Sequence, residues 1–126
     1  MKYIIDAHAW IEYFKGSEKG EKVNEVLSSA NEIYVLAITI AEVIGKVKRA
    51  NGNVKLVYNA MVSKAKIIEI PPKVAKEAGM LYAENRKIMP QFGIVDAMII
   101  STAKHINARI LTGDYHFKRF PETESL

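Results

Sequence analysis

The sequence predicts an α/β protein in three layers, with a central parallel sheet of four to five short strands between two layers of helices. Short apolar runs, typical of strands covered on both faces, alternate along the chain with longer stretches whose apolar residues recur at helical spacing. The chain has 126 residues and shows no internal repeat or linker. We therefore expect a single domain over residues 1–126.

Composition narrows the class of protein. Hydrophobic residues make up 49% and charged residues 25%, as in globular proteins. The absence of cysteine excludes disulfides, thiolate zinc sites and cysteine nucleophiles, and favours a cytoplasmic location. Only three apolar residues separate Lys2 from Asp6, so no signal peptide is expected, and the longest apolar stretch, 33–44, is too short to span a membrane. The net charge of +4 is a mild bias toward polyanions.

The first half of the chain shows two strand patterns and four helix patterns. These are a strand over 2–5, helices over 9–14 and 18–30, a strand over 33–37, and helices over 39–50 and 54–65. Gly16 and Ser17 separate the first two helices, and Ser17 can cap the second. Thr39 opens the third helix, and the Asn51–Asn53 segment turns the chain into the fourth.

The second half continues the alternation. A strand over 66–70 is stopped by two prolines, and a helix over 74–86 and a loop over 87–93 follow. Asp96 then begins a helix whose buried side carries Ala97, Ile100, Ala103 and Ile106. Residues 108–112 read as a buried strand, and the polar tail over 121–126 is expected to have little structure.

Four carboxylates from distant parts of the chain fall at one edge of this predicted sheet. Asp6 ends the first strand, and Glu42 lies in the first turn of the helix after the second strand. Asp96 starts a helix that runs antiparallel to the following strand, and Asp114 comes just after that strand. All four therefore lie at the carboxyl ends of the strands, where open α/β sheets bind ligands.

Carboxylates held close together repel one another, and protons or cations must compensate them. Oxygen ligands suit Mg²⁺ or Mn²⁺, and the absence of cysteine makes zinc a poor alternative. A bound ion of this kind activates water and stabilises charge on a phosphoryl oxygen, which points to hydrolysis of a phosphodiester. The chain has no Walker-type phosphate loop, so nucleotide triphosphate hydrolysis by that route is excluded.

Each carboxylate also has a structural explanation. Thr39 and Glu42 fit a capping box, Asp96 suits a helix N-terminus, and Asp114 fits a Thr-Gly-Asp turn. The structural explanation is weakest for Asp6, because an aspartate that closes a buried strand does little for folding. Their convergence at one edge favours a metal site over four separate structural roles.

Four segments in order carry a further signal. They are Tyr-Ile-Ile-Asp-Ala-His-Ala-Trp-Ile at 3–11, Thr-Ile-Ala-Glu at 39–42, Val-Asp-Ala-Met-Ile-Ile-Ser-Thr-Ala at 95–103 and Leu-Thr-Gly-Asp-Tyr-His-Phe at 111–117. Together they resemble the PIN-domain family, in particular the small VapC-type toxin ribonucleases of toxin–antitoxin pairs. The resemblance covers nearly the whole chain and extends the fold expectation to a PIN-like α/β/α arrangement.

The resemblance implies a Mg²⁺- or Mn²⁺-dependent endoribonuclease that acts on RNA, forms a homodimer and is inhibited by a protein antitoxin. By motif match, Asp6, Glu42, Asp96 and Asp114 hold the metal and activate water, and Thr112 is a supporting hydroxyl. Two alternatives stay open: a PIN-domain RNA-processing nuclease without an antitoxin, and a non-catalytic RNA-binding PIN-like module.

The chain departs from the family pattern at two histidines. His8 stands where serine, threonine or asparagine is common, and His116 stands where another acid is frequent. The resemblance therefore implies one acidic ligand fewer, which bears on whether a second metal binds. His8 either contacts substrate or is a packed structural residue.

The helical hairpin over 39–65 is a candidate partner surface. Its apolar residues Val57, Tyr58 and Met61 either form a dimer surface, line a groove for an antitoxin, or pack in the core. Its basic residues either steer RNA or form a solvated helix face; they are Lys46, Lys48, Arg49, Lys55 and Lys64.

Overall fold

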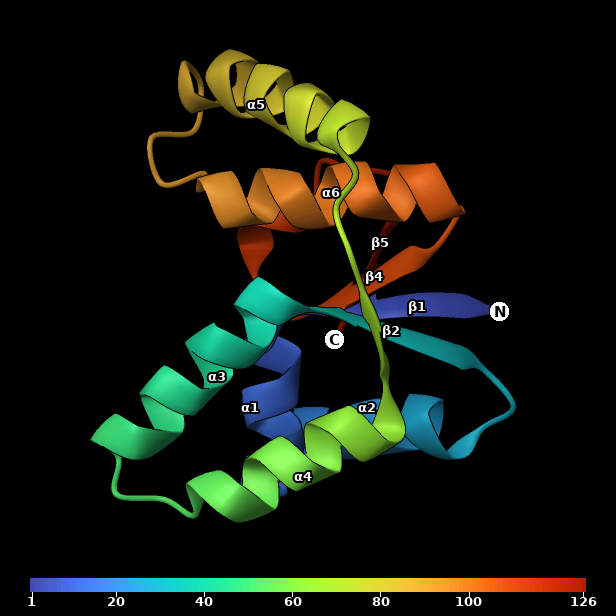
Figure 1. The fold of residues 1–126 in the computed structure, drawn as a ribbon, viewed down its shortest axis with the longest axis vertical. Helices are drawn as coiled ribbons and strands as arrows, with labels where there is room; N and C mark the ends of the chain where they lie inside the picture. The colour runs from blue at the N-terminus through green and yellow to red at the C-terminus, as the bar shows by residue number, and fades with distance from the viewer.

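The computed structural model describes residues 1–126 as a sheet with helices on both faces, as Figure 1 shows. The strands are β1 (Lys2–Ile5), β2 (Glu32–Leu36), β3 (Lys66–Ile68), β4 (Arg109–Thr112) and β5 (Thr123–Ser125). The helices are α1 (Ala7–Lys15), α2 (Glu18–Ser28), α3 (Ala37–Arg49), α4 (Val54–Lys64), α5 (Pro72–Arg86) and α6 (Ile94–Ile106), and a short 3-10 helix, η1, covers Tyr115–Phe117. The predicted α/β class is confirmed.

The five strands form one parallel sheet in the order β3-β2-β1-β4-β5. The chain starts at the central strand, moves out through β2 to β3, and then returns to the other side of β1 for β4 and β5. Strands β1 and β4 are therefore neighbours, with Ile5 opposite Leu111. The sheet changes winding direction between these two strands, and this is the place where open α/β sheets form their ligand sites.

Side chains alternate between two cores, one on each face of the sheet. Tyr3 and Ile5 of β1 belong to a core that includes Trp10 and Val43 from the helices below, whereas Ile4 belongs to the opposite core. This alternation is the period of two that a strand imposes. Because both faces of the strands are covered, their sequences read as continuous apolar runs.

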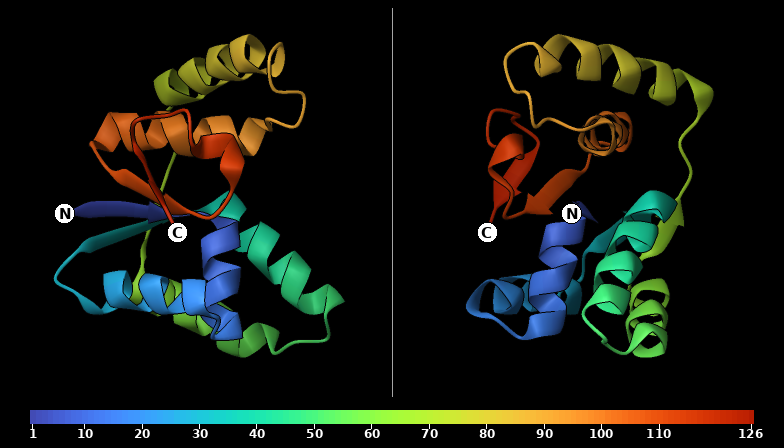
Figure 2. Two further views of the ribbon diagram at one scale, coloured as in Figure 1. Left: turned by 180° about the vertical axis from the view of Figure 1, so that it is seen from behind. Right: turned by 90° about the vertical axis from the view of Figure 1, so that its left-hand side faces the viewer.

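The helices form two unequal layers, as the views in Figures 1 and 2 show. Helices α1 to α4 lie on one side of the sheet, and α6 lies against the other side with α5 packed on it. None of these helices is both long and apolar enough to cross a membrane.

The start of α3 corrects one prediction. The helix begins at Ala37, two residues before Thr39, and the residue that precedes it, Leu36, makes no side-chain cap. Thr39 is the third residue of the helix and is fully buried. The capping-box explanation for Thr39 and Glu42 is therefore wrong, because an N-cap residue must precede the first helical turn.

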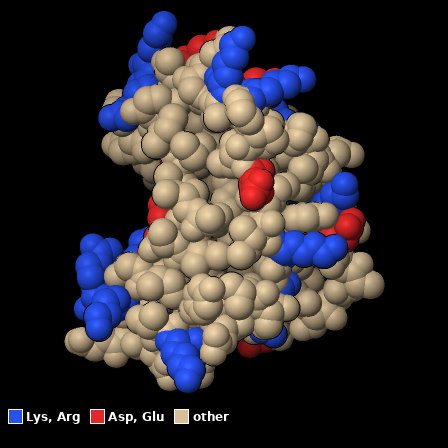
Figure 3. Space-filling view, in the orientation of Figure 1, with Lys and Arg blue, Asp and Glu red and all other residues tan.

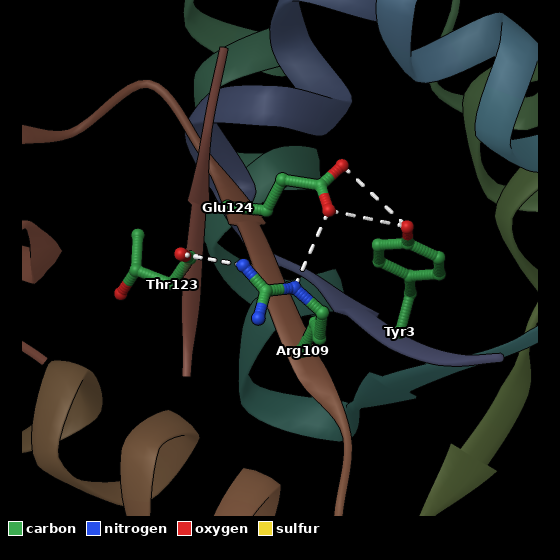
Figure 4. A network of polar contacts seen from close by, with 4 residues as sticks. All are labelled: Tyr3, Arg109, Thr123 and Glu124. Carbon is green, nitrogen blue, oxygen red and sulfur yellow. Dashed lines mark hydrogen bonds and ion pairs between the residues drawn. The ribbon is translucent and has the colours of Figure 1, made fainter. Parts of the chain in front are cut away.

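The C-terminal tail corrects a second prediction, since it forms a strand. β5 pairs in parallel with β4, and Leu126 N–H donates to the carbonyl oxygen of Thr112 at 2.9 Å. Figure 4 shows the side chains that fasten it: Glu124 accepts from Arg109 Nε at 3.3 Å and from the Tyr3 hydroxyl at 3.3 Å. The strand arises from the unpaired edge of β4, and its own polar residues carry no alternating apolar pattern.

Candidate active site

The structure places the four carboxylates at the carboxyl-terminal edge of the sheet. Asp6 follows β1 and caps α1, and Asp114 comes two residues after β4 and caps η1. Asp96 is the third residue of α6. Glu42 is the sixth residue of α3, so it lies in the second turn of the helix and not in the first as predicted.

Asp6 is the most deeply buried of the four, with 4% of its surface exposed. One carboxylate oxygen accepts the Ala9 N–H at 2.9 Å, and the other accepts the Thr112 hydroxyl at 2.6 Å. Burial raises the pKa of Asp6 to about 6, against the lowering effect of these two hydrogen bonds; Asp114 and Asp96 raise it further. The charged form of Asp6 is thus disfavoured by its surroundings.

Thr112 connects two of the carboxylates. Its hydroxyl donates to Asp6 Oδ2 and accepts the backbone N–H of Asp114 at 3.0 Å. Thr112 is fully buried at the end of β4, next to β1. The hydroxyl therefore fixes the start of the Asp114 turn relative to Asp6, across 106 residues of sequence.

Asp96 is half-buried and belongs to the first turn of α6. Its Oδ2 accepts the Gly93 N–H at 2.8 Å, which is the side-chain half of a capping box. Burial is the main cause that raises the pKa of Asp96, and the Asp114 charge adds to it, whereas the Gly93 N–H and His116 lower it. One oxygen thus serves the helix start, and the other makes no hydrogen bond within the protein.

Glu42 lies on the surface of α3 and makes no hydrogen bond within the protein. Its partial removal from water and the charge of Asp96 raise its pKa, while Lys46 acts in the opposite direction. The charge of Asp96, on α6 at the other side of the sheet, is thus felt at Glu42. Glu42 is the one of the four whose carboxylate accepts no hydrogen bond from the protein, whereas Asp6, Asp96 and Asp114 each accept at least one.

Asp114 pairs with His116. The carboxylate Oδ1 accepts the backbone N–H of His116 at 3.0 Å and lies 2.9 Å from the ring Nδ1 of the same residue. The other ring nitrogen, Nε2, is buried without a hydrogen-bond partner. The sequence motifs marked His116 as a departure from the acidic pattern but did not predict this pairing. An aspartate and a histidine two residues apart, just past a strand end, were the available signal.

The ring of His8 packs over Gly113, which is the residue between Thr112 and Asp114. A Cβ atom on Gly113 would stand 2.5 Å from His8 Cε1 and 2.7 Å from Nδ1, so only glycine leaves room for this ring. His8 Nδ1 is buried without a hydrogen-bond partner. The structure thus shows His8 as a packed residue at the rim of the carboxylate cluster.

Charge repulsion between neighbouring carboxylates raises the pKa of three of the four. Asp96 and Asp114 raise the pKa of Asp6, Asp114 raises that of Asp96, and Asp96 raises that of Glu42. Only Asp114 has a basic partner in an ion pair, and this partner is His116. In the positions seen here, no three His, Asp or Glu side chains lie close enough together to hold one metal ion.

The donor set fits a hard divalent cation in its chemistry. It is made of carboxylate oxygens, of which those of Glu42 and one on Asp96 are not engaged by other protein groups. The negative charges lie close enough to disfavour one another, and a cation would compensate them.

Comparisons with known structures agree on the fold. A chain of VapBC2 from Rickettsia felis, solved bound to a DNA fragment from its promoter, is 22% identical with a TM-score of 0.77, covering 99% of this chain and 98% of that one. A chain of a toxin–antitoxin complex from Klebsiella pneumoniae is 22% identical with a TM-score of 0.76, covering 98% and 96%. Mycobacterium tuberculosis VapC20, a sarcin–ricin loop cleaving toxin, is 11% identical with a TM-score of 0.74, covering 94% and 95%.

No curated protein matches the chain by sequence. The model of one protein family, described as the PIN domain, matches residues 3–123. This match spans almost the whole chain and includes all four carboxylates, which confirms the resemblance seen in the sequence motifs. By this match and by its fold, the chain belongs to the PIN domain family.

Proposed function

We propose that the protein is a metal-dependent endoribonuclease and the toxin of a VapBC-type toxin–antitoxin pair. The observation that carries the proposal is the convergence of Asp6, Glu42, Asp96 and Asp114 on one edge of the sheet at its switch point, where neighbouring carboxylate charges raise the pKa of Asp6, Glu42 and Asp96. Membership of the PIN domain family and the likeness to VapBC structures support it.

The proposed metal is Mg²⁺ or Mn²⁺, held by the four carboxylates. A bound divalent ion would neutralise the cluster, polarise a water molecule and stabilise negative charge on a phosphoryl oxygen. Asp6 and Asp96 would provide fixed oxygens, since the Thr112 hydroxyl and the Gly93 N–H already orient them. Glu42, which nothing holds, can turn toward the ion. The supporting role proposed for Thr112 is to keep Asp6 and the Asp114 turn in register.

RNA is the proposed substrate. VapC20, whose fold is similar, is a toxin that cleaves the sarcin–ricin loop. The net charge of +4 includes the four carboxylates of the cluster, so the rest of the surface is more basic than this total and favours a polyanion. The proposed place of action is the cytoplasm, where RNA is present and a chain without cysteine needs no oxidising compartment.

A protein antitoxin is the proposed partner, by likeness to VapBC complexes. A hollow of about 500 Å³ between α1, α3 and α4 supports this, because it is lined by apolar side chains such as Phe14, Val47 and Leu56. Leu56 is 59% exposed in the isolated chain. Such a groove suits the apolar face of a partner helix.

A homodimer is also proposed. The exposed side chains of Ile38 and Ile67 border a second apolar hollow of about 390 Å³, formed where α3 begins and where the edge strand β3 ends. A patch of this kind beside an uncovered sheet edge suits an isologous contact between two copies.

The test of the nuclease uses purified protein, Mn²⁺ and a labelled RNA. Asp6→Asn and Asp96→Asn are expected to lower kcat/KM at least about a hundredfold, since losing even an outer partner of a metal ligand costs 10- to 100-fold. Circular dichroism should show an unchanged fold, and Glu84→Gln on the exposed face of α5 is the matched control. Wild-type protein that neither cuts RNA nor binds a divalent ion contradicts the proposal.

The toxin part is tested in cells. Expression of the wild-type chain should arrest growth, and co-expression of the small protein encoded beside it should relieve the arrest. Asp96→Asn should not arrest growth. Cleavage of RNA in vitro without any growth effect would favour an RNA-processing nuclease and contradict the toxin assignment.

A further inference from the structure

One face of α3 continues outward from the carboxylate cluster and carries two cations. Glu42, Gly45, Lys46 and Arg49 line a hollow of about 470 Å³ together with Ala41. Residues three, four and seven positions apart lie on one side of a helix. With a rise of 1.5 Å per residue, Lys46 and Arg49 stand roughly 6 Å and roughly 10 Å along the axis from Glu42. We call this surface, defined by Glu42, Gly45, Lys46 and Arg49, the α3 track.

Neither cation of the α3 track has an acidic partner. The ion pairs of the molecule join Lys104 to Glu122, Arg109 to Glu124 and His116 to Asp114, and none involves Lys46 or Arg49. The influence of Lys46 on its neighbour shows in the pKa of Glu42, which Lys46 lowers. The track therefore carries two positive charges that are not held in ion pairs, of which Lys46 lies nearer to Glu42.

The floor of the α3 track is open. A Cβ atom built on Gly45 would meet nothing within 4 Å, so no other part of the protein covers this stretch of helix. Figure 3 shows basic side chains gathered at the lower left, over the outer ends of α3 and α4 as Figure 1 orients them. The outline of the molecule is indented above them, between this arm and the lobe formed by α5 and α6.

We propose that the α3 track holds the sugar-phosphate backbone of the RNA strand on one side of the bond that is cut, with Lys46 and Arg49 each contacting a phosphate. The inference rests on the proposed nuclease function and adds its substrate path. Arg49 offers the planar fork of donors that matches a phosphate, and Lys46 adds a compact charge nearer the site. A floor without large side chains lets the strand approach the helix closely.

The same helix provides a matched control. Lys48 is exposed and is one residue from Arg49, but it does not line the hollow. If Lys46 and Arg49 were only part of a solvated helix face, the three cations would be equivalent. If the α3 track binds RNA, Lys48 is dispensable.

Binding is measured with a fluorescein-labelled 12-nucleotide single-stranded RNA in the Asp96→Asn background, so that the RNA stays intact. Lys46→Gln/Arg49→Gln should raise Kd about tenfold near 100 mM salt. The slope of log K against log salt should become shallower by about 1.4, because each phosphate contact on a single strand contributes about 0.7. Lys48→Gln should reduce the slope by much less than half of that amount.

Turnover in the wild-type background separates binding from chemistry. The variant for this measurement is Arg49→Gln, because it keeps Lys46, whose charge acts on Glu42. With RNA and Mn²⁺, Arg49→Gln should raise KM and leave kcat unchanged. With bis(p-nitrophenyl) phosphate, which is too short to extend along α3, Arg49→Gln should match wild type.

The outcomes distinguish this inference from the proposed function. The α3 track is overturned if Lys46→Gln/Arg49→Gln has the same Kd and salt slope as its parent protein. It is also overturned if Lys48→Gln loses as much RNA affinity and salt slope as Lys46→Gln/Arg49→Gln. Neither result contradicts the proposed nuclease. Loss of hydrolysis of bis(p-nitrophenyl) phosphate in Arg49→Gln also overturns the α3 track. Wild-type protein that cuts neither substrate contradicts the proposed nuclease. If Lys46→Gln/Arg49→Gln still lowers RNA affinity in that case, RNA binding by the α3 track is supported on its own.

Discussion

Asp6 shows how a single side chain can be costly for folding and useful for binding a cation. It is almost completely buried, and two hydrogen bonds from Ala9 and Thr112 only partly offset the loss of water around its charge. The neighbouring charges of Asp96 and Asp114 increase this cost. A group placed in this way accepts a proton more readily than an exposed aspartate does, and a nearby cation would offset the same cost.

The raised pKa of Asp6 predicts how stability depends on pH in the absence of metal. The folded pKa of about 6 lies above the ordinary value of 3.8, so the folded state binds the proton more tightly than the unfolded state. The stabilisation is fully present below about pH 4 and is lost as pH rises through 6, and a shift of this size corresponds to about 3 kcal/mol at most. Urea unfolding in EDTA between pH 4 and 7 should show this loss in wild type.

Asp6→Asn is the comparison for this measurement, because it carries no titrating proton. The difference in unfolding free energy between the variant and wild type should move in favour of the variant as pH rises from 4 to 7. A difference that does not change with pH over this range would mean that folding does not raise the pKa of Asp6.

Thr112 predicts a contrast between two buried threonines. Thr112→Val removes the donor to Asp6 and the acceptor for the Asp114 N–H, so it should destabilise the metal-free protein by about 1–3 kcal/mol. Thr102→Val removes only a local bond from the Thr102 hydroxyl to the Met98 carbonyl within α6, and should cost less than about 1 kcal/mol. Equal losses in chemical unfolding would argue against the linking role of Thr112.

At the scale of elements, three of the four carboxylates lie at helix starts. Asp6 caps α1, Asp96 accepts the Gly93 N–H at the start of α6, and Asp114 caps η1. Acids at these positions interact favourably with the exposed N–H groups of a first turn. The structural and the functional explanations for these residues are therefore compatible: the helix starts hold the carboxylates in place at the edge of the sheet.

The strand β5 predicts that the C-terminal segment contributes to stability. Deletion of residues 121–126 removes the pairing with β4 and the hydrogen bond from Leu126 to Thr112, a loss of several backbone bonds of about 1 kcal/mol each. Thermal and urea unfolding should show a loss of about 3 kcal/mol. Glu124→Gln, which weakens a half-exposed ion pair with Arg109, should cost less than about 1 kcal/mol. A deletion no more harmful than Glu124→Gln would contradict this role.

At the scale of the molecule, the carboxylate cluster lies where the two helical layers meet the sheet edge. Asp6 caps α1 and Glu42 belongs to α3, both helices on one face of the sheet, whereas Asp96 belongs to α6 on the other face. The two apolar cores pack on separate faces of the sheet, whereas the charge of Asp96 acts across the sheet edge on Asp6 and Glu42. A cation held there would connect the two layers.

This arrangement predicts that Mn²⁺ stabilises the whole fold. At a free concentration about 100 times its Kd, the ion should raise the unfolding free energy by about 2.7 kcal/mol and raise Tm accordingly. Asp96→Asn should lose most of this effect, and Glu84→Gln should keep it. Differential scanning calorimetry with and without Mn²⁺ measures both, and an equal rise in Tm for Asp96→Asn would place the ion elsewhere.

The sequence by itself determined the fold class and the edge at which the carboxylates gather. Continuous apolar runs such as Tyr3–Ile5 specify strands buried on both faces, and a parallel sheet brings all strand ends to one edge. Asp6 at a strand end and Asp96 at a helix start followed from local patterns. The PIN-domain motifs in the four quoted segments were also readable, and the match over residues 3–123 confirms them.

Only the tertiary structure decided which of these elements are neighbours. The position of β4 beside β1 brings Thr112 to Asp6 across 106 residues, and the free edge of β4 turns a polar tail into a strand. The start of α3 two residues before Thr39 and the ring pairing of His116 with Asp114 also depend on contacts between elements. Local sequence carries propensity and periodicity, whereas these features arise from hydrogen bonds and packing between segments that meet only when the chain has folded.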